Sequence, residues 1–174
     1  DLVSGQSLTG SWKNGDGKMI IEKAPGGLKI PEGLKPLSNR MLIIRNIDEN
    51  GAERSRDLAF LVKIGDYYFL DRFPDYTPAD QTMDPLYHSL FIKQHIIFRV
   101  NEAADSNTLE LQRVSDKRIK EEIEKKEIRI KMLTREDGNI ILASTEELQN
   151  HIRKYASDPV FYEGDNKKTF TRIP

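Results

Sequence analysis

The sequence contains no cysteine. This absence excludes a cysteine nucleophile, a thiolate zinc site, an iron–sulfur cluster and a disulfide framework. No apolar run approaches the ~20 residues that a membrane-spanning helix needs. Positive and negative side chains nearly balance, with 27 Lys and Arg against 28 Asp and Glu and a formal net charge of −1. A nucleic-acid-binding protein normally carries a basic stripe, so we expect no nucleic-acid partner.

Signatures of common enzymes are also missing. The chain has no Gly-x-Ser-x-Gly, Ser-x-x-Lys, phosphate-binding loop or dinucleotide-binding fingerprint. Its three histidines are His88, His95 and His151. The first two are seven residues apart on an extended segment, so they face opposite ways and cannot share one metal ion. We expect His151 to lie at a helix edge and predict no metal site, no cofactor and no enzymatic activity.

Four aspartates occur in or beside one stretch rich in proline, at Asp71, Asp75, Asp80 and Asp84. Their spacing is not that of an EF-hand and lacks its bidentate glutamate. We therefore expect a solvated acidic loop here and no calcium site.

The 174 residues suffice for one domain, which we expect to span residues 1–174. The chain begins with Asp1 and not with Met, and residues 1–9 are polar enough for a flexible tether. Two interpretations of this start stay open. It either follows a lipid-bearing cysteine upstream of residue 1, as in a bacterial lipoprotein, or it is the trimmed start of a longer chain.

Short alternating segments separated by turn residues predict consecutive β-hairpins. Gly65-Asp66 is the clearest turn, and residues 24–39 hold enough Pro and Gly to predict a loop. The long segment 73–87 is also predicted as a loop. The expected strands are residues 10–13, 18–23, 40–45, 58–64, 67–72, 88–100, 108–114, 128–132, 139–143 and 169–173.

Helix is expected only in the C-terminal third. One helix is predicted over residues 117–126, with Ile119 and Ile123 on one face. The other is predicted to begin after Ser144, because Ser144 and Glu147 match a capping box, and to run to Tyr155. Parallel strands would need helices between them, and the first 114 residues show none. The order predicts a β-rich α+β protein, an antiparallel meander forming a barrel or half-barrel with two C-terminal helices; a flatter sheet with both helices on one face is the alternative.

The first expected strand opens with Gly10-Ser11-Trp12. This Gly-x-Trp, together with the hairpin order, resembles the lipocalins and the wider calycins. The resemblance implies that Trp12 closes one end of the barrel and that a basic residue of the last strand, Arg172, packs over it. A Thr-Asp-Tyr-type turn, the second lipocalin signature, is missing, and the family has one late helix where two are expected here.

Residues 90–173 also resemble uncharacterised secreted or lipoprotein-type proteins of bacterial envelopes. The residues that carry this likeness are Asp137-Gly138-Asn139-Ile140-Ile141-Leu142, Ser144-Thr145-Glu146-Glu147-Leu148-Gln149, Lys154-Tyr155 and Phe161. The resemblance implies an extracytoplasmic location, in the periplasm or cell envelope, and no particular activity.

Aromatic residues concentrate around the long loop 73–87, where a barrel could admit a small hydrophobic ligand. We predict that Tyr67, Phe69, Tyr76, Tyr87, Gln94 and Phe98 line this site. The leading hypothesis is a non-enzymatic protein that binds a small lipophilic ligand. A second is an envelope protein–protein interaction module with a filled core, and a third is a hydrolase with an unrecognised site, which a shielded acid–base pair would favour.

Overall fold

A computed structural model gives the fold of the chain. It describes residues 1–15, 17–28, 32–75, 96–102, 107–113, 115, 118, 121, 122, 124, 125, 132–135, 138–141, 144–158, 160–162 and 167–174. The named elements are η1 (Gln6–Leu8), β1 (Gly10–Asn14), β2 (Gly17–Lys23), η2 (Glu32–Arg40), β3 (Met41–Ile47), β4 (Glu53–Ile64), β5 (Tyr67–Pro74), β6 (Ile96–Glu102), β7 (Thr108–Arg113), β8 (Met132–Arg135), β9 (Gly138–Ile141), α3 (Thr145–Tyr155), η3 (Val160–Tyr162) and β10 (Lys167–Ile173).

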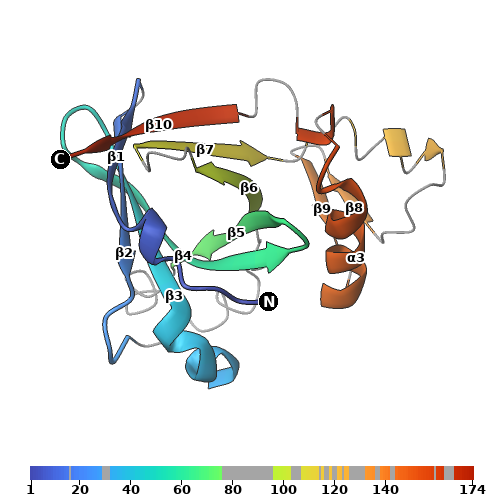
Figure 1. Ribbon diagram of the computed structural model, residues 1–174, viewed down its shortest axis with the longest axis horizontal. Coiled ribbons are helices and arrows are strands. Elements are labelled where there is room, and N and C mark those ends of the chain that lie inside the picture. Colours follow the sequence, from blue (N-terminus) through green and yellow to red (C-terminus); the bar gives the residue numbers. More distant parts are fainter. Residues whose placement is uncertain are drawn as a thin grey trace.

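Eight of the strands form a closed antiparallel barrel in the order β1-β10-β7-β6-β5-β4-β3-β2 (Figure 1). Strands β8 and β9 form a separate two-stranded sheet. Most barrel strands lie within a few residues of those expected, but β4 begins five residues earlier, at Glu53, and residues 88–95 of the expected strand 88–100 lie outside the described residues. The barrel strands confirm the prediction of a β-rich, mostly antiparallel barrel, and the alternative of an open, flat sheet is wrong.

The first and last strands complete the barrel. Trp12 of β1 lies opposite Arg172 of β10, and the neighbouring pairs Ser11–Ile173 and Lys13–Thr171 continue this ladder. Closing the sheet leaves neither strand with an unpaired edge. Both chain ends therefore contribute to the same part of the wall.

Helix α3 follows the predicted boundaries. The Ser144 hydroxyl accepts a hydrogen bond from the Glu147 backbone N–H, and the Glu147 carboxylate accepts one from the Ser144 N–H. Of the helix expected over residues 117–126, the described residues Arg118, Glu121, Glu122 and Glu124 are helical. No helix in the described part of the chain is long and apolar enough to cross a membrane.

The segment expected as a loop over residues 24–39 contains the 3₁₀ helix η2, in spite of Pro36. Leu34 and Leu37, three residues apart, pack against Met41 and Phe60 on the outside of the barrel. A spacing of three brings side chains to the same side of a 3₁₀ helix. Burial of this pair therefore outweighs the turn-forming tendency of the local sequence.

Residues 1–9, expected as a flexible tether, lie against the barrel instead. Leu2 forms a β-bridge with Val62, the Val3 N–H donates to the Leu61 carbonyl, and Leu8 is buried. Backbone hydrogen bonds also join Asp1 to Lys63, and the side chains of Leu2 and Val3 pack against the barrel. A segment that is polar on average is thus held by backbone pairing with β4 and by three apolar side chains.

Candidate ligand site in the barrel

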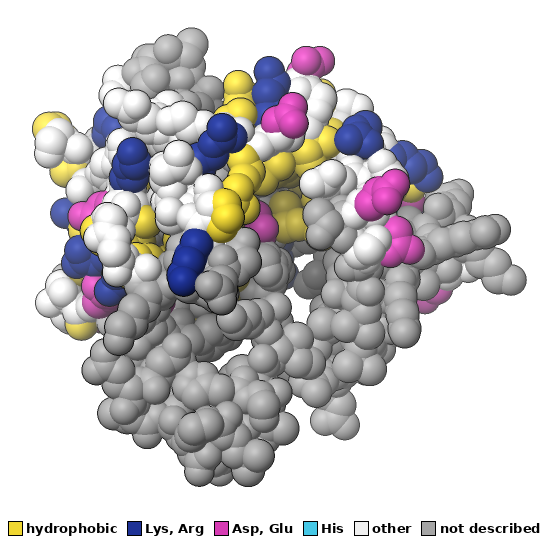
Figure 2. Space-filling model, turned by 90° about the horizontal axis from the view of Figure 1, so that it is seen from below, with side chains coloured by type: hydrophobic (Ala, Val, Ile, Leu, Met, Phe, Trp, Pro, Cys, Tyr) yellow, Lys and Arg dark blue, Asp and Glu magenta, His cyan; other side chains and the backbone are white. Residues whose placement is uncertain are grey.

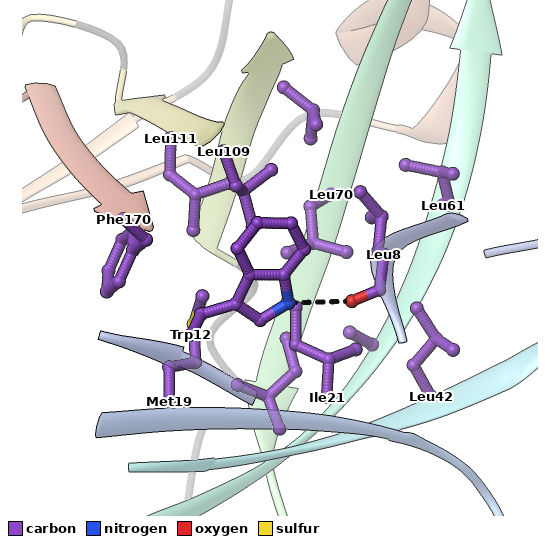
Figure 3. Close-up of a cluster of buried hydrophobic side chains, with 13 residues drawn as sticks. Leu8, Trp12, Met19, Ile21, Leu42, Leu61, Leu70, Leu109, Leu111 and Phe170 are labelled. Carbon is purple, nitrogen blue, oxygen red and sulfur yellow. Dashed lines mark hydrogen bonds between the residues drawn. The ribbon is translucent and has the colours of Figure 1, made fainter. Parts of the chain in front are cut away.

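One end of the barrel is closed by the residues that resemble the lipocalin pattern. The indole of Trp12 is fully buried, and its Nε1 donates to the Leu8 carbonyl at 2.9 Å (Figure 3). The Arg172 guanidinium lies 4.2 Å from the centre of the indole ring. It also donates to the carbonyls of Thr9 at 2.8 Å and Ser7 at 2.7 Å. Arg172 therefore fixes η1 across the end of the barrel.

Gly10 explains the first residue of the Gly-x-Trp sequence. Its φ is +137°, a conformation that L side chains rarely adopt. A Cβ placed on it would lie 2.8 Å from Nη1 of Arg172. Because that guanidinium is held by two carbonyls and by the indole, a side chain at position 10 would have to displace it.

The half of the barrel next to η1, which we call the closed half, is filled by side chains. Its members come from η1 and from every strand of the barrel, and Phe98 packs against them. Figure 3 shows them converging around the indole of Trp12. They are Leu8, Trp12, Met19, Ile21, Leu42, Ile44, Ala59, Leu61, Leu70, Val100, Leu109, Leu111 and Phe170.

The inner face becomes polar in the other half, which we call the polar half. Arg72 follows Leu70 by two residues and so shares its inward direction. Its Nη2 donates to the carboxylate of Asp57, and its guanidinium lies 5.4 Å from the centre of the Phe98 ring. The side chains of Arg72 and Asp57 are 15% and 16% exposed. An ion pair and an aromatic ring thus lie directly above the apolar filling.

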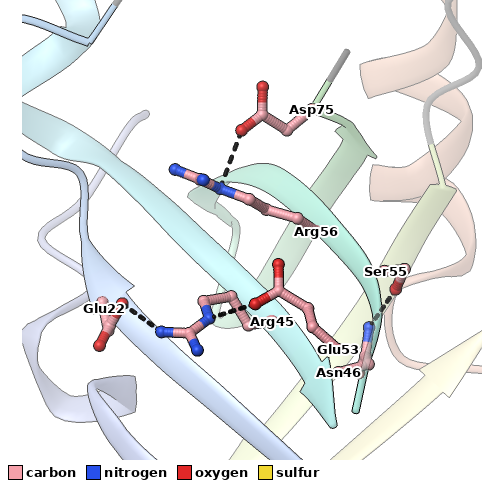
Figure 4. Close-up of polar contacts among 7 residues, drawn as sticks. All are labelled: Glu22, Arg45, Asn46, Glu53, Ser55, Arg56 and Asp75. Carbon is pink, nitrogen blue, oxygen red and sulfur yellow. Dashed lines mark hydrogen bonds and ion pairs between the residues drawn. The ribbon is translucent and has the colours of Figure 1, made fainter. Parts of the chain in front are cut away.

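A second polar contact occurs on the neighbouring strands. Asn46 follows Ile44 by two residues, and its Nδ2 donates to Oγ of Ser55 at 2.8 Å (Figure 4). The pair lies beside the turn that joins β3 to β4. Strand β5 ends at Pro74 at this same end, so the segment expected to border the entrance begins here.

The structure places the predicted site residues in different parts of the molecule. Phe98 lies inside the barrel. Tyr67 and Phe69 lie on the outer wall, because they alternate with the inward-facing Leu70. These two side chains therefore do not face the interior in which Phe98 lies. Tyr76, Tyr87 and Gln94 lie outside the described residues, as do His88 and His95.

Sequence reasoning missed the Arg72–Asp57 pair. The expected strand began at Leu58, whereas β4 begins at Glu53 and so includes Asp57. The sequence did contain a signal for this pair, because Asp57 and Arg72 carry opposite charges at inward positions of adjacent strands. Once the strand is extended, Asp57 lies on the same face as Ala59, which is part of the filled interior.

The acidic segment also differs from the expectation of a solvated loop. The carboxylate of Asp75 is buried and lies 3.0 Å from the Arg56 guanidinium (Figure 4). The Asp75 N–H donates to the Arg56 carbonyl. Asp71 belongs to β5, while Asp80 and Asp84 lie outside the described residues. Among the described residues, no group of three or more His, Asp and Glu side chains could hold a metal ion.

The outer wall carries a buried polar cluster that sequence reasoning did not find. Tyr155 of α3 donates a hydrogen bond to the carboxylate of Glu122, which Arg118 approaches at 3.7 Å. The His151 ring lies 4.9 Å from that of Tyr155 and 5.3 Å from that of Phe161. Glu122, His151 and Tyr155 are buried, and Tyr155 belongs to the cluster that joins α3 to Phe69 of the barrel wall. His151 is therefore a packing residue and not the helix-edge residue that was expected.

Burial sets the protonation of His151. Removal from water lowers its pKa from 6.5 to about 4, with Lys154 contributing in the same direction and Glu122 opposing it. The pKa of Tyr155 is raised, first by burial and then by its hydrogen bond to Glu122. The cluster therefore keeps a neutral imidazole against the wall of the barrel.

We predict that Gly10→Ala lowers the free energy of unfolding by about 1–3 kcal/mol, since it adds backbone strain and displaces the Arg172 guanidinium. Urea denaturation followed by Trp12 fluorescence measures this change. Gly15→Ala is the matched control, because a Cβ there meets nothing within 4 Å. Equal stabilities of the two variants would show that Gly10 is not needed for the closure.

We predict a loss of stability on acidification that depends on His151. The folded pKa of about 4 lies below the unfolded value of 6.5, so the unfolded chain binds the proton first as pH falls. The contribution is complete above pH 6.5 and is lost as pH falls through 6.5 to 4, by up to about 3 kcal/mol. Urea denaturation at several pH values should show a smaller decline for His151→Phe than for the wild type. Parallel declines would contradict the assignment.

Comparisons with known protein families, with curated proteins and with solved structures gave no match to this chain.

Proposed function

We propose that the protein is a non-enzymatic, extracytoplasmic protein of lipocalin-like build that binds a small hydrophobic ligand in the polar half of its barrel. The observation that carries this proposal is the change in the inner face from apolar filling to an Arg72–Asp57 pair beside Phe98. The likeness of residues 90–173 to envelope proteins supports the location, including a lipoprotein-type anchor. That likeness does not bear on the ligand.

The closed half limits where a ligand can lie. Leu8 and Trp12 occupy the interior next to η1, and Arg172 secures this end. A ligand would therefore enter from the opposite end and stop at the layer formed by Leu70 and Val100. An eight-stranded barrel is wide enough for one small ligand where side chains do not fill it.

Apolar contact surface is present in the polar half. Phe98 is half-buried, and Ile96, on the same face of β6, is 42% exposed. Covering such surface stabilises a complex by about 25 cal/mol per Å². Polar groups beside it, such as Arg72 and Asn46, would orient the ligand and contribute selectivity.

A second candidate is an interaction module for another envelope protein. Two observations favour it: the filled closed half, and the apolar band that runs between charged side chains on the face shown in Figure 2. Val62 on the outer wall is half-buried. It packs against two outer apolar clusters, one around Phe60 beside η2 and one around Phe69 beside α3. Such a protein would bind no small ligand in its barrel.

We predict that the neutral fluorophore N-phenyl-1-naphthylamine binds the protein with enhanced emission and that Phe98→Ser weakens this binding about tenfold or more. Ile20→Ser, on the outer face of β2, is the control and should bind like the wild type. Fluorescence titration measures both affinities, and native mass spectrometry of the purified protein reports any ligand already bound. Absence of binding, or equal loss in both variants, would contradict the barrel site and favour the interaction module.

A further inference from the structure

We propose that the ligand carries an acidic head group, a carboxylate or phosphate, which Arg72 and Arg113 bind on either side of Phe98. This inference rests on the proposed function, because it names the class of ligand for the same site.

The register places two arginines next to one aromatic ring. Phe98 of β6 lies opposite Arg113 of β7, and on its other side it lies opposite Leu70 of β5. Arg72 lies one inward position beyond Leu70, opposite Ile96. Alternation gives Arg113 the inward direction of Leu109 and Leu111. Two guanidinium groups thus flank the apolar surface that a ligand would cover.

Arg72 is held in place for such a role. One hydrogen bond joins its Nη2 to Asp57, and its guanidinium packs against the Phe98 ring. A guanidinium has five N–H donors, so this single bond leaves donors for a second oxygen acceptor. Carboxylates and phosphates present paired oxygens that fit the fork of an arginine.

Amphiphiles with a common twelve-carbon chain test the head group. Dodecanoate, dodecyl phosphate, dodecanol and dodecyltrimethylammonium would each be titrated, below its micelle concentration, against the protein loaded with N-phenyl-1-naphthylamine. We expect one or both acidic probes to displace the fluorophore about tenfold or more better than dodecanol. The stronger of the two identifies the acid.

Variants test whether the two arginines cause the preference for acidic probes over dodecanol. Arg72→Met and Arg113→Met should each reduce the advantage of the acidic probe over dodecanol about tenfold, with dodecanol itself unchanged. Arg113 is exposed, so its variant does not threaten folding, and Arg72→Lys keeps the charge beside Asp57 while losing the fork. Arg153→Met, on the exposed face of α3, is the matched control and should keep the wild-type preference.

The outcomes distinguish a failure of the acidic head group from a failure of the proposed ligand-binding function. Equal displacement by dodecanol and both acids, or strongest displacement by the ammonium probe, overturns the acidic head group and leaves the barrel site standing. An acid preference that persists in both arginine variants also overturns it. Failure of the fluorophore to bind overturns the proposed function and, with it, this inference.

Discussion

The contact between Arg172 and Trp12 joins the two ends of the chain and closes the barrel. Strands β1 and β10 pair through three residue pairs, so little backbone ladder holds them together. Arg172 adds a cation–π contact to Trp12 and two hydrogen bonds, one to the Ser7 carbonyl in η1 and one to the Thr9 carbonyl just after it. These contacts also place Leu8 over the indole and so seal one end. Without them, β1 and β10 would become free edges able to pair with other chains.

Closure divides the apolar residues between the interior and two clusters on the outer wall. One outer cluster surrounds Phe60 beside η2, and the other surrounds Phe69 beside α3. Because inward and outward positions alternate, each strand that is apolar on both faces needs a cover on its outside. On β3 and β4, η2 supplies that cover for Ile43 and Phe60. Around the β4–β5 hairpin, α3 and η3 supply it, with Ile152 and Phe161 packed on Phe69. Segments η2, α3 and η3 thus cover parts of the wall that the barrel itself leaves apolar, and none of their described residues belongs to the filled closed half.

Much of the fold could be predicted from the sequence because hairpins and capped helices depend on local signals. The Gly65-Asp66 turn and the Ser144–Glu147 capping box are such signals, and both produced the correct elements. Segment η2 and residues 1–9 were not predictable in this way, because distant partners on β3 and β4 hold them.

The candidate site was harder to predict than the fold. Assigning Tyr67 and Phe69 to the interior required the direction of β5, which a run of three aromatic residues conceals. Only the burial of Leu70 with Trp12 decides it. The inward Asp57 was missed for a related reason, since β4 extends five residues before the apolar run from which a strand was expected. Local periodicity therefore identified the strands, while their faces and ends were set by long-range packing.

The long connection between β7 and β10 links the outer wall to the polar half. Strand β7 ends at Arg113 and β10 begins at Lys167, and the two strands are neighbours in the barrel. The Ser115 N–H donates to the Phe161 carbonyl at 3.1 Å, which ties the start of this connection to its end beside the barrel. Phe161 in turn stacks on Tyr155, which bonds to the buried Glu122. The contacts among Glu122, Tyr155 and Phe161 beside α3 thereby fix where the chain leaves β7. They also fix the position of Arg113, the last residue of β7, at the mouth of the polar half.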